Sequence, residues 1–432
     1  MNGQSASFED TINALTRAIP SSAVWTIADE VLIEALCRNE RVVYGRIGAR
    51  VAWLMMRADA VGLALPAGIL LGLTDLARSM WLAWRVNRVP SSLPESARNG
   101  VAVFIGFGAR AEAHLYQEFC SQASGLVIRI DQTRLAVSTG PVRPGLTVVW
   151  SSMMSAIGEA AAAWRSLPAS LRARRSDVAA TISRRIAPYI FARAWWKEVA
   201  QFAKVQDARF MAADVMAFAA VREGISSSFQ QHGLLSRGLV FPSFENVYPL
   251  TRFEARYLQQ RIPGVIVHPP RHVARAVSPV RQRRVLIAST NLPADEMRQI
   301  GDLVQKLAAC GVTIHVRLFP GESADRFWRG ADLGASFTIE DGDPSLEAAL
   351  ERLQPLFVVS WASTVLVEAL HDGRIPITVA ASDDRYIERT AYPLFRCCLR
   401  WPQNRADVMA ALAGPTDADR ILERLRELGD VA

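Results

Sequence analysis

Two hydroxyl residues and a carboxylate stand at helical spacing towards the C-terminal end of the chain. Ser363 and Thr364 come where a helix is expected to begin, after the apolar run 356–360, and Glu368 follows Thr364 by four residues. The free N–H groups of a first helical turn and the two hydroxyls would point at one spot, which suits a phosphate. Residues four apart share a helix face, so Glu368 could hydrogen-bond a ribose or sugar hydroxyl. An N-capped crossover helix with a solvated glutamate would show the same pattern.

Two earlier strand ends carry further polar residues. Arg317 closes the predicted strand 312–318, and Thr290 and Asn291 follow the predicted strand 285–288. Loops that follow the strands of a doubly wound sheet are where such sheets bind ligands. We therefore expect Thr290 and Asn291 at a ligand site of this kind. A surface arginine and an ordinary N-cap pair are the alternative interpretation.

A histidine in the middle of the chain has polar neighbours. His232 lies in the run Gln230-Gln231-His232-Gly233. An imidazole that titrates near neutral pH can remove a proton from a hydroxyl or stabilise a departing phosphate. We expect Gly233 to permit a strained backbone beside it. A purely structural histidine is the alternative. No histidine has partners at the spacing of a metal site, so no zinc site is predicted.

A glycine-rich turn offers a different chemistry. Gly106 and Gly108 belong to a G-x-G-x-x-A run between the predicted strand 101–105 and a helix, and Asp131 ends the next strand. This pattern approximates the fingerprint that binds NAD(P) or FAD, so an oxidoreductase using the Gly106–Ala111 loop is an alternative function. Nearly a hundred residues precede the run, however, and Glu112 would bring negative charge close to a pyrophosphate.

The segment 360–376, in which Ser363, Thr364 and Glu368 precede a Gly-x-x-Pro turn, resembles the donor-site helix of GT-B glycosyltransferases. It is most similar to bacterial enzymes of capsule and surface-polysaccharide synthesis, including sialyl-, Kdo- and polyol-phosphate transferases. The resemblance covers about residues 285–400 and only weakly the preceding lobe.

The resemblance implies two Rossmann-like lobes and a metal-independent glycosyltransferase without a cofactor. The C-terminal lobe would hold the nucleotide sugar, with Ser363 and Thr364 on the phosphate and Glu368 on the ribose or sugar. His232 would act as the base, and the loop of Gly106 and Gly108 would face the acceptor.

One position departs from the family pattern. Capsule-type enzymes often carry a histidine on the donor phosphate two residues after the arginine, and this chain has Phe319 there while keeping Arg317. Without this histidine the chain would lack one contact to the donor phosphate that the resemblance implies for an active enzyme. A catalytically degenerate glycan-binding protein is therefore a second alternative function.

Composition limits the classes of partner. The chain has 432 residues, 50% hydrophobic, with a net charge of +7 carried almost wholly by arginine. This composition excludes a disordered protein, and arginine suits phosphate groups, although a GC-rich genome would also favour it. No stretch resembles a module that reads nucleic acid, so no nucleic-acid partner is expected. The five cysteines form no disulfide framework, which favours the cytoplasm.

The most apolar run raises the question of membrane contact. Residues 61–74 are too few for the roughly 20 residues of a spanning helix. A buried helix, an interfacial helix and a re-entrant hairpin bent near Pro66 remain possible. Tryptophans and arginines within 51–85 suit a peripheral contact with the inner membrane.

The order of predicted elements gives an α/β protein with an added helical N-terminal region. We expect a helical region over 1–95, an acceptor-side lobe over 96–270 and a donor-side lobe over 271–432. The basic stretch 271–284 is expected to be a linker and 241–249 a loop. Strands are predicted at 101–105, 126–131, 146–150, 265–268, 285–288, 312–318, 336–339, 356–360 and 375–380. Helices are predicted up to Gln122, across 153–206, and at 294–309, 345–353 and 364–371.

The expected function is transfer of a sugar or polyol phosphate from a nucleotide-activated donor. The acceptor would be a surface polysaccharide or a lipid-linked glycan.

Overall fold

The structure is a computed structural model of the whole chain. It describes residues 12–14, 17, 25, 29–37, 40–42, 45–86, 100–106, 113–123, 125–131, 144–235, 239–271, 281–289, 294–318, 337–340, 346–361, 363–379 and 397–430. The chain forms two compact units. Unit 1 comprises Met1–His232, Arg237–Tyr248 and Leu258–His268, and unit 2 comprises Gly233–Ser236, Pro249–Tyr257 and Pro269–Ala432.

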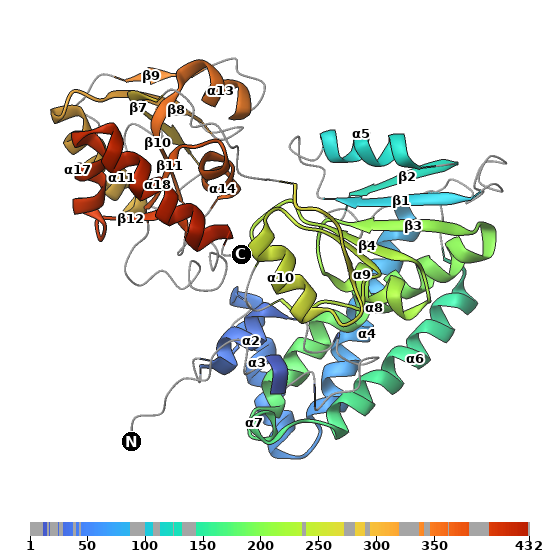
Figure 1. The fold of residues 1–432 in the computed structure, drawn as a ribbon. Helices are drawn as coiled ribbons and strands as arrows, with labels where there is room; N and C mark the ends of the chain where they lie inside the picture. Colours follow the sequence, from blue (N-terminus) through green and yellow to red (C-terminus); the bar gives the residue numbers. More distant parts are fainter. Residues whose placement is uncertain are drawn as a thin grey trace. The chain divides into compact units, whose positions relative to one another are not determined.

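Unit 1 is built on a parallel six-stranded sheet, here sheet A, in the order β2-β1-β3-β4-β5-β6 (Figure 1). Its strands are β1 (Val101–Gly106), β2 (Leu126–Asp131), β3 (Val205–Phe210), β4 (Ser227–Gln230), β5 (Asn246–Tyr248) and β6 (Ile266–Val267). Parallel pairing requires a crossover between successive strands, and most of the crossovers in unit 1 are helical.

The helices of unit 1 lie on both sides of sheet A. They are α2 (Glu30–Cys37), α3 (Gly45–Ala60), α4 (Ala64–Val86), α5 (Ala113–Gln122), α6 (Leu146–Arg165), α7 (Ala169–Arg172), α8 (Arg175–Phe202) and α9 (Val215–Arg222). A further helix, α10 (Arg252–Arg261), begins in unit 2 and ends in unit 1. Leu115 and Phe119 of α5 pack on Phe104 of β1, and Figure 1 shows α4, α6 and α8 together on the other side.

Helix α8 is the centre of the helical layer, and α4 approaches it very closely. A Cβ added at Gly68 would lie 2.7 Å from the carbonyl oxygen of Ala179, and one at Gly72 would collide with Ile186. Both glycines belong to α4, and both contacts are on α8. Small residues four apart let two helix backbones come together, so glycine is required at both positions.

A buried ionic network joins the same helices. The Glu159 carboxylate of α6 accepts hydrogen bonds from Arg193 Nη1 at 2.9 Å, Arg222 Nε at 2.8 Å, Tyr189 OH at 3.0 Å and Trp25 Nε1 at 3.1 Å. Burial, together with the neighbouring Glu159 charge, raises the pKa of Tyr189, so the phenol stays neutral. Such a carboxylate is tolerated inside a protein because each oxygen has several donors.

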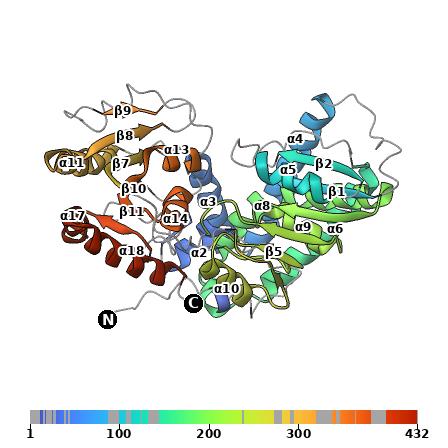
Figure 2. The same cartoon turned by 45° about the horizontal axis from the view of Figure 1, so that its top comes forward.

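Unit 2 contains a second parallel six-stranded sheet, sheet B, in the order β12-β11-β10-β7-β8-β9 (Figure 2). Its strands are β7 (Gln282–Ala288), β8 (Thr313–Arg317), β9 (Thr338–Ile339), β10 (Pro355–Ser360), β11 (Ile375–Val379) and β12 (Leu399–Trp401). Its helices are α11 (Ala294–Ala309), α13 (Leu346–Leu353), α14 (Thr364–His371), α17 (Arg405–Ala413) and α18 (Pro415–Asp430).

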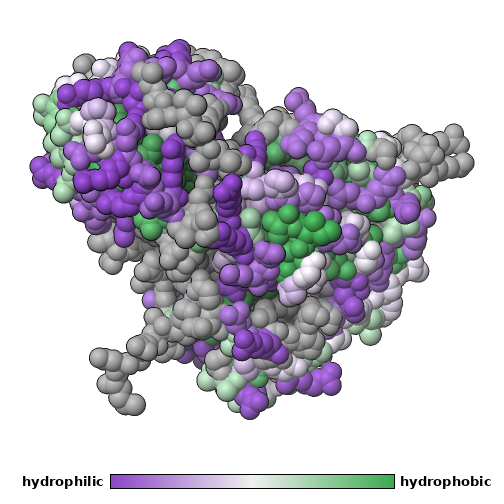
Figure 3. Space-filling model, in the orientation of Figure 1, coloured by the Kyte–Doolittle hydropathy of each residue, from purple (hydrophilic) through white to green (hydrophobic). Residues whose placement is uncertain are grey.

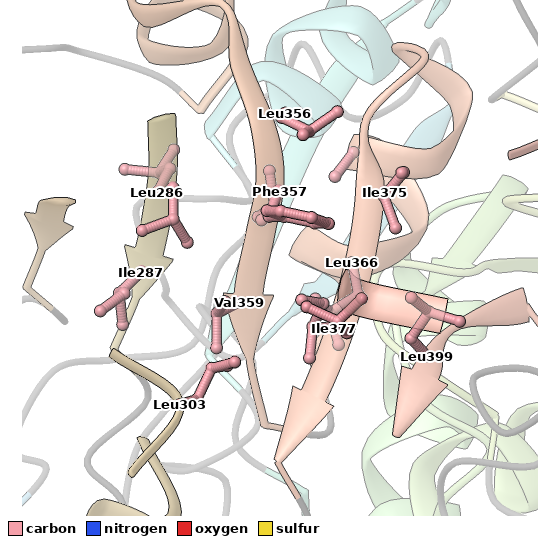
Figure 4. Packing of buried hydrophobic residues seen from close by; sticks show 14 of the residues in the cluster. Leu286, Ile287, Leu303, Leu356, Phe357, Val359, Leu366, Ile375, Ile377 and Leu399 are labelled. Carbon is pink, nitrogen blue, oxygen red and sulfur yellow. The ribbon is translucent and has the colours of Figure 1, made fainter. Parts of the chain in front are cut away.

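The core of unit 2 is one continuous apolar cluster around sheet B. Phe357 of β10 lies between Leu286 of β7 and Ile375 of β11, and Leu366 of α14 packs nearby (Figure 4). Strands β10 and β11 are buried along their whole length. Unbroken apolar runs are typical of parallel strands that are covered on both faces.

The two parallel sheets with flanking helices confirm the predicted α/β architecture of two Rossmann-like lobes. Within the described residues, the first 95 positions are helical as predicted, and their helices pack in unit 1. Most predicted strands of sheet B agree with the structure to within a few residues.

Three predicted elements are wrong. Residues 146–150 form the first turns of α6 rather than a strand, because their β-branched residues are overridden by packing on α8. The expected loop 241–249 contains β5, and the expected linker 271–284 includes the start of β7 at Gln282.

The apolar run 61–74 is not a re-entrant hairpin. Helix α4 continues without a break from Ala64 to Val86, and Pro66 lies in its first turn, where a missing N–H costs nothing. One side of α4 is buried and another is exposed to solvent. Ala64, Gly68 and Gly72 are buried, whereas Leu70 and the preceding residue Leu63 are exposed.

Candidate functional site

The carboxyl ends of three neighbouring strands in sheet B bring polar residues together. Arg317 ends β8 and pairs with Ala288 at the end of β7. The amide of Ser289 donates to the Arg317 carbonyl oxygen at 2.9 Å, and the buried Ser360 hydroxyl at the end of β10 donates to Ala288 O at 2.8 Å. Ligands bind at this edge in open parallel sheets.

Helix α14 starts beside that edge, at the residues that the sequence indicates. Ser363 is the N-cap, with extended backbone, and its hydroxyl accepts from the amide of Val365 at 3.4 Å. Thr364 is the first helical residue. The hydroxyl of Ser363 therefore has a capping role in this structure. The amide of Leu366 donates to the Ser363 carbonyl oxygen at 3.2 Å, so the amide of Thr364 is the N–H of the first turn that is left for an anion.

Glu368 lies one turn into α14 and is largely buried. Burial raises its pKa above the ordinary value, the charges of Arg271 and Arg317 act in the opposite direction, and Glu347 adds to the increase. The positive charges of both arginines therefore favour the ionised form of this carboxyl group. Sequence analysis did not identify Arg271, which lies 97 positions before Glu368 in the chain.

Arg317 has an incompletely satisfied guanidinium group. Its Nη1 atom is buried and has no hydrogen-bond partner among the residues that the structure describes. A buried N–H without an acceptor costs free energy, which an incoming anion would recover. Arg317, the start of α14 and Glu368 form what we call the sheet B site.

Several predicted site residues lie outside the described residues. Thr290, Asn291 and Phe319 fall in the segments 290–293 and 319–336, and Gly108 falls in 107–112. Gly106 is described as the last residue of β1. The roles predicted for these residues stay predictions.

His232 lies just beyond the carboxyl end of β4 in sheet A. The amide of Gln231 donates to the Tyr248 carbonyl oxygen at 3.1 Å, which continues the pairing of β4 with β5 up to the residue before His232. The predicted need for glycine at 233 is wrong in this structure. Gly233 is not among the glycines with positive φ, and a Cβ there would meet nothing within 4 Å.

A stacked column of side chains, which the sequence did not predict, lies at the same edge of sheet A. The Arg209 guanidinium lies 4.7 Å from the Phe119 ring and 4.5 Å from the Tyr248 ring. The ring of His268 stacks on Tyr248 at 4.2 Å between centroids, with 13° between the planes. These contacts place a buried cation among aromatic rings, where cation–π attraction stabilises it.

Hydrogen bonds fix the column from both sides. Arg209 Nη2 donates to Asp207 at 3.2 Å, and His268 Nε2 is 3.0 Å from Asn246 Oδ1. Because an amide oxygen only accepts, His268 Nε2 is the donor in this contact. No sequence signal identified the column, because Tyr248 belongs to the strand that was predicted to be a loop.

Within the described residues, no group of three or more His, Cys, Asp or Glu side chains could hold a metal ion. A histidine and a carboxylate do meet in unit 2. His315 Nδ1 of β8 lies 2.6 Å from Glu340 Oε1, and Arg352 donates to the other carboxylate oxygen.

No known family profile matches the chain, and no curated protein matches its sequence. Solved structures resemble it at low identity. S. aureus MnaA with UDP is 11% identical, covers 77% of this chain and 91% of its own, and has a TM-score of 0.40. The glycosyltransferase SnogD from Streptomyces nogalater is 13% identical and covers 77% and 98%, with a TM-score of 0.38. The wall teichoic acid polymerase TagF with CDPG is 10% identical and covers 90% and 93%, with a TM-score of 0.41.

Proposed function

We propose that the protein transfers a sugar or a polyol phosphate from a nucleotide-activated donor to a surface polysaccharide or lipid-linked glycan. The observation that carries the proposal is the sheet B site. There the N-terminus of α14, the Glu368 carboxyl and a buried Arg317 nitrogen that has no partner among the described residues all belong to unit 2, and the charge of Arg317 acts on the Glu368 carboxyl. Together they supply N–H donors and positive charge for a phosphate and a carboxyl for a neighbouring hydroxyl.

The proposed chemistry assigns one task to each group. The bond between the donor's transferred group and its nucleotide phosphate breaks, and a bond to an acceptor oxygen forms. The helix N-terminus and Arg317 stabilise the negative charge that develops on the leaving nucleotide. His232 takes the proton from the acceptor hydroxyl. In this scheme the charge is stabilised by protein groups, and neither a metal ion nor a cofactor is assigned a role.

The proposal includes a cytoplasmic setting, where activated nucleotides are made. All five cysteines are free, which suits a reducing compartment. Nucleic acid is not among the proposed partners.

A thermal-shift and calorimetric screen with CMP, CDP, UDP, GDP and NAD tests the donor class. One pyrimidine or purine nucleotide of the donor type is expected to raise the unfolding temperature, by mass action on the folded state. Stabilisation by NAD alone would instead favour the oxidoreductase. Binding of a glycan without turnover of any donor would favour the degenerate binding protein.

Site variants then localise the ligand. Arg317→Gln and the pair Ser363→Ala/Thr364→Ala are expected to weaken nucleotide binding by about tenfold or more, since each removes a charge-assisted contact or a donor. Arg420→Gln is the matched control, because this arginine is highly exposed on α18 and distant in sequence from the site. Unchanged nucleotide affinity in the site variants would overturn the assignment of the sheet B site.

A further inference from the structure

Helix α6 leaves a row of large apolar side chains exposed on unit 1. Leu146 is 65% exposed, Trp150 63% and Met154 54%. Residues spaced by four lie on one face of a helix, so the three form a continuous stripe. Figure 1 shows α6 at the margin of unit 1. In the same orientation, Figure 3 shows hydrophobic and hydrophilic residues mixed over the visible face of this unit.

The end of α8 extends the stripe. The amide of Gly145, just before α6, donates to the Glu198 carboxylate of α8 at 3.2 Å. This contact places the start of α6 beside the last turn of α8, where Phe202 is 47% exposed. We call Leu146, Trp150, Met154 and Phe202 the α6 stripe.

The charges around the α6 stripe are unbalanced towards positive. The single acidic residue of α6 is Glu159, which is buried and paired with Arg193 and Arg222. Arg165 is exposed at the end of α6, and Lys204 is exposed two residues after Phe202. Glu198, the carboxylate beside the start of α6, accepts from the Gly145 amide, and Lys197 stands next to it on α8. The exposed face of α6 itself carries no carboxylate, and the cations Lys204 and Arg165 lie near its two ends, a balance that favours an anionic surface.

The dimensions of the stripe argue against a second copy of the chain. From Leu146 to Met154 the helix advances by about 12 Å, and a helix is about 10 Å wide, so the footprint is on the order of 100 Å². A stable protein interface needs about 800 Å² per partner. A lipid surface needs no matching partner area, because apolar side chains enter the boundary between headgroups and acyl chains one by one.

Helix α6 is long and apolar enough to cross a membrane by length and composition alone, but its packing indicates another placement. A third of its apolar window is buried inside unit 1, and Glu159 is fixed in the ionic network. We propose that α6 docks the protein flat on an anionic lipid bilayer through the α6 stripe. This inference does not rest on glycosyl transfer, because docking requires neither donor nor acceptor.

Flotation of the full chain with vesicles tests the proposal. The wild type is expected to float with mixed phosphatidylglycerol–phosphatidylcholine vesicles, more weakly with phosphatidylcholine alone, and less as salt is raised. The triple variant L146Q/W150Q/M154Q is expected to bind the mixed vesicles about tenfold or more weakly, because three apolar contacts are lost. Met409→Gln with Leu428→Gln, two exposed apolar residues of unit 2, is the matched control.

The outcomes are distinct. An unchanged thermal unfolding midpoint shows that the triple variant is folded, and glutamine favours helix at these exposed positions. The docking surface is supported if the triple variant loses vesicle binding while the wild type and the control variant keep it. Failure of the wild type to bind either vesicle, or equal binding by the triple variant, overturns it. A wild-type dimer that the triple variant converts to a monomer, measured by light scattering, would assign the stripe to a second copy instead.

Discussion

The two units each cover a parallel six-stranded sheet with helices, but they differ in the side chains that pack in the interior. Unit 2 surrounds sheet B with one apolar cluster that includes Phe357 and Leu303, while unit 1 places the carboxylate of Glu159 inside its helical layer and the cation of Arg209 against its sheet. Apolar cores tolerate compensating changes of similar volume, whereas a buried charge depends on each of its partners. Unit 1 therefore depends on a buried carboxylate with many partners, whereas unit 2 buries its charges in smaller groups such as Arg374 with Asp372.

The largest expected effect is at the ionic network. Glu159→Ala removes the acceptor of two arginines, a tyrosine and a tryptophan, and should cost about 3–5 kcal/mol of the unfolding free energy of unit 1. Hydrogen exchange with mass spectrometry under increasing denaturant would follow each unit separately. Glu118→Ala on the exposed side of α5 is the control, with an expected change within about 0.5 kcal/mol. Equal loss of protection in both units would contradict the separation.

An apolar deletion in unit 2 provides the converse test. Leu303→Ala empties a fully buried site on α11 and should cost about 2–5 kcal/mol, confined to unit 2 in the same experiment. Leu428→Ala, at a 40% exposed position on α18, should cost clearly less. If Leu303→Ala shifted only the protection of unit 1, the assignment of the two cores would be wrong.

Helix caps differ between the units by a smaller amount. Asp214 caps α9 through one carboxylate oxygen that accepts from Met216 N at 3.0 Å and Ala217 N at 3.2 Å, whereas Ser363 caps α14 through one bond of 3.4 Å. Asp214→Ala should therefore cost about 1–2 kcal/mol and Ser363→Ala about 0.5–1 kcal/mol in chemical denaturation. A larger loss for Ser363→Ala would show that its hydroxyl has a structural role beyond this cap.

The smallest effects concern two carboxyl groups of unit 2 with opposite pKa shifts. Burial opposes ionisation of Glu340, but hydrogen bonds from His315 and Arg352 outweigh it and lower its pKa, so ionised Glu340 stabilises the fold above its unfolded pKa. That stability is lost as the pH falls through the lowered folded value. Burial raises the pKa of Glu368, so its ionisation costs stability as the pH rises from the unfolded through the folded value.

Unfolding free energies of two glutamine variants between about pH 3 and pH 8 check these signs. Glu340→Gln should be less stable than the wild type at neutral pH, and the deficit should shrink on acidification. Glu368→Gln should be more stable at neutral pH, and that gain should vanish on acidification. Changes of the same sign in both variants would contradict the opposite environments of the two carboxyl groups.

The sequence predicts sheet B better than sheet A for a physical reason. Strands such as β10 are apolar runs buried on both faces, which the composition of the run reveals. Strand β4 is buried too, but its serines are satisfied through bonds that depend on the fold. Ser228 donates to Asp207 at 2.9 Å, and Ser227 donates to Ile225 O at 2.7 Å. A polar strand of this kind cannot be recognised before its partners are known.

Some features of the candidate site could also be predicted from the sequence, and others could not. The start of α14 at Ser363 and Thr364 is predictable, because capping residues and the following apolar period are local signals. The proximity of Arg271 to Glu368 and the stacking of Arg209 on Tyr248 are not, since they depend on how distant segments come together. The sequence therefore predicts which polar residues begin a helix, but not which distant residues act on their charges.

The glycine contact between α4 and α8 has a consequence for how the N-terminal helices are seated. A Cβ at Gly68 would meet a backbone carbonyl, which cannot move aside as a side chain can. Sliding α4 along α8 by one residue would bring Ala67 or Ile69 to that point, and the Cβ of either residue would force the helices apart. Only one alignment of α4 is therefore compatible with close approach. The contact therefore fixes the position of α4 along α8, the helix at the centre of the layer that covers sheet A.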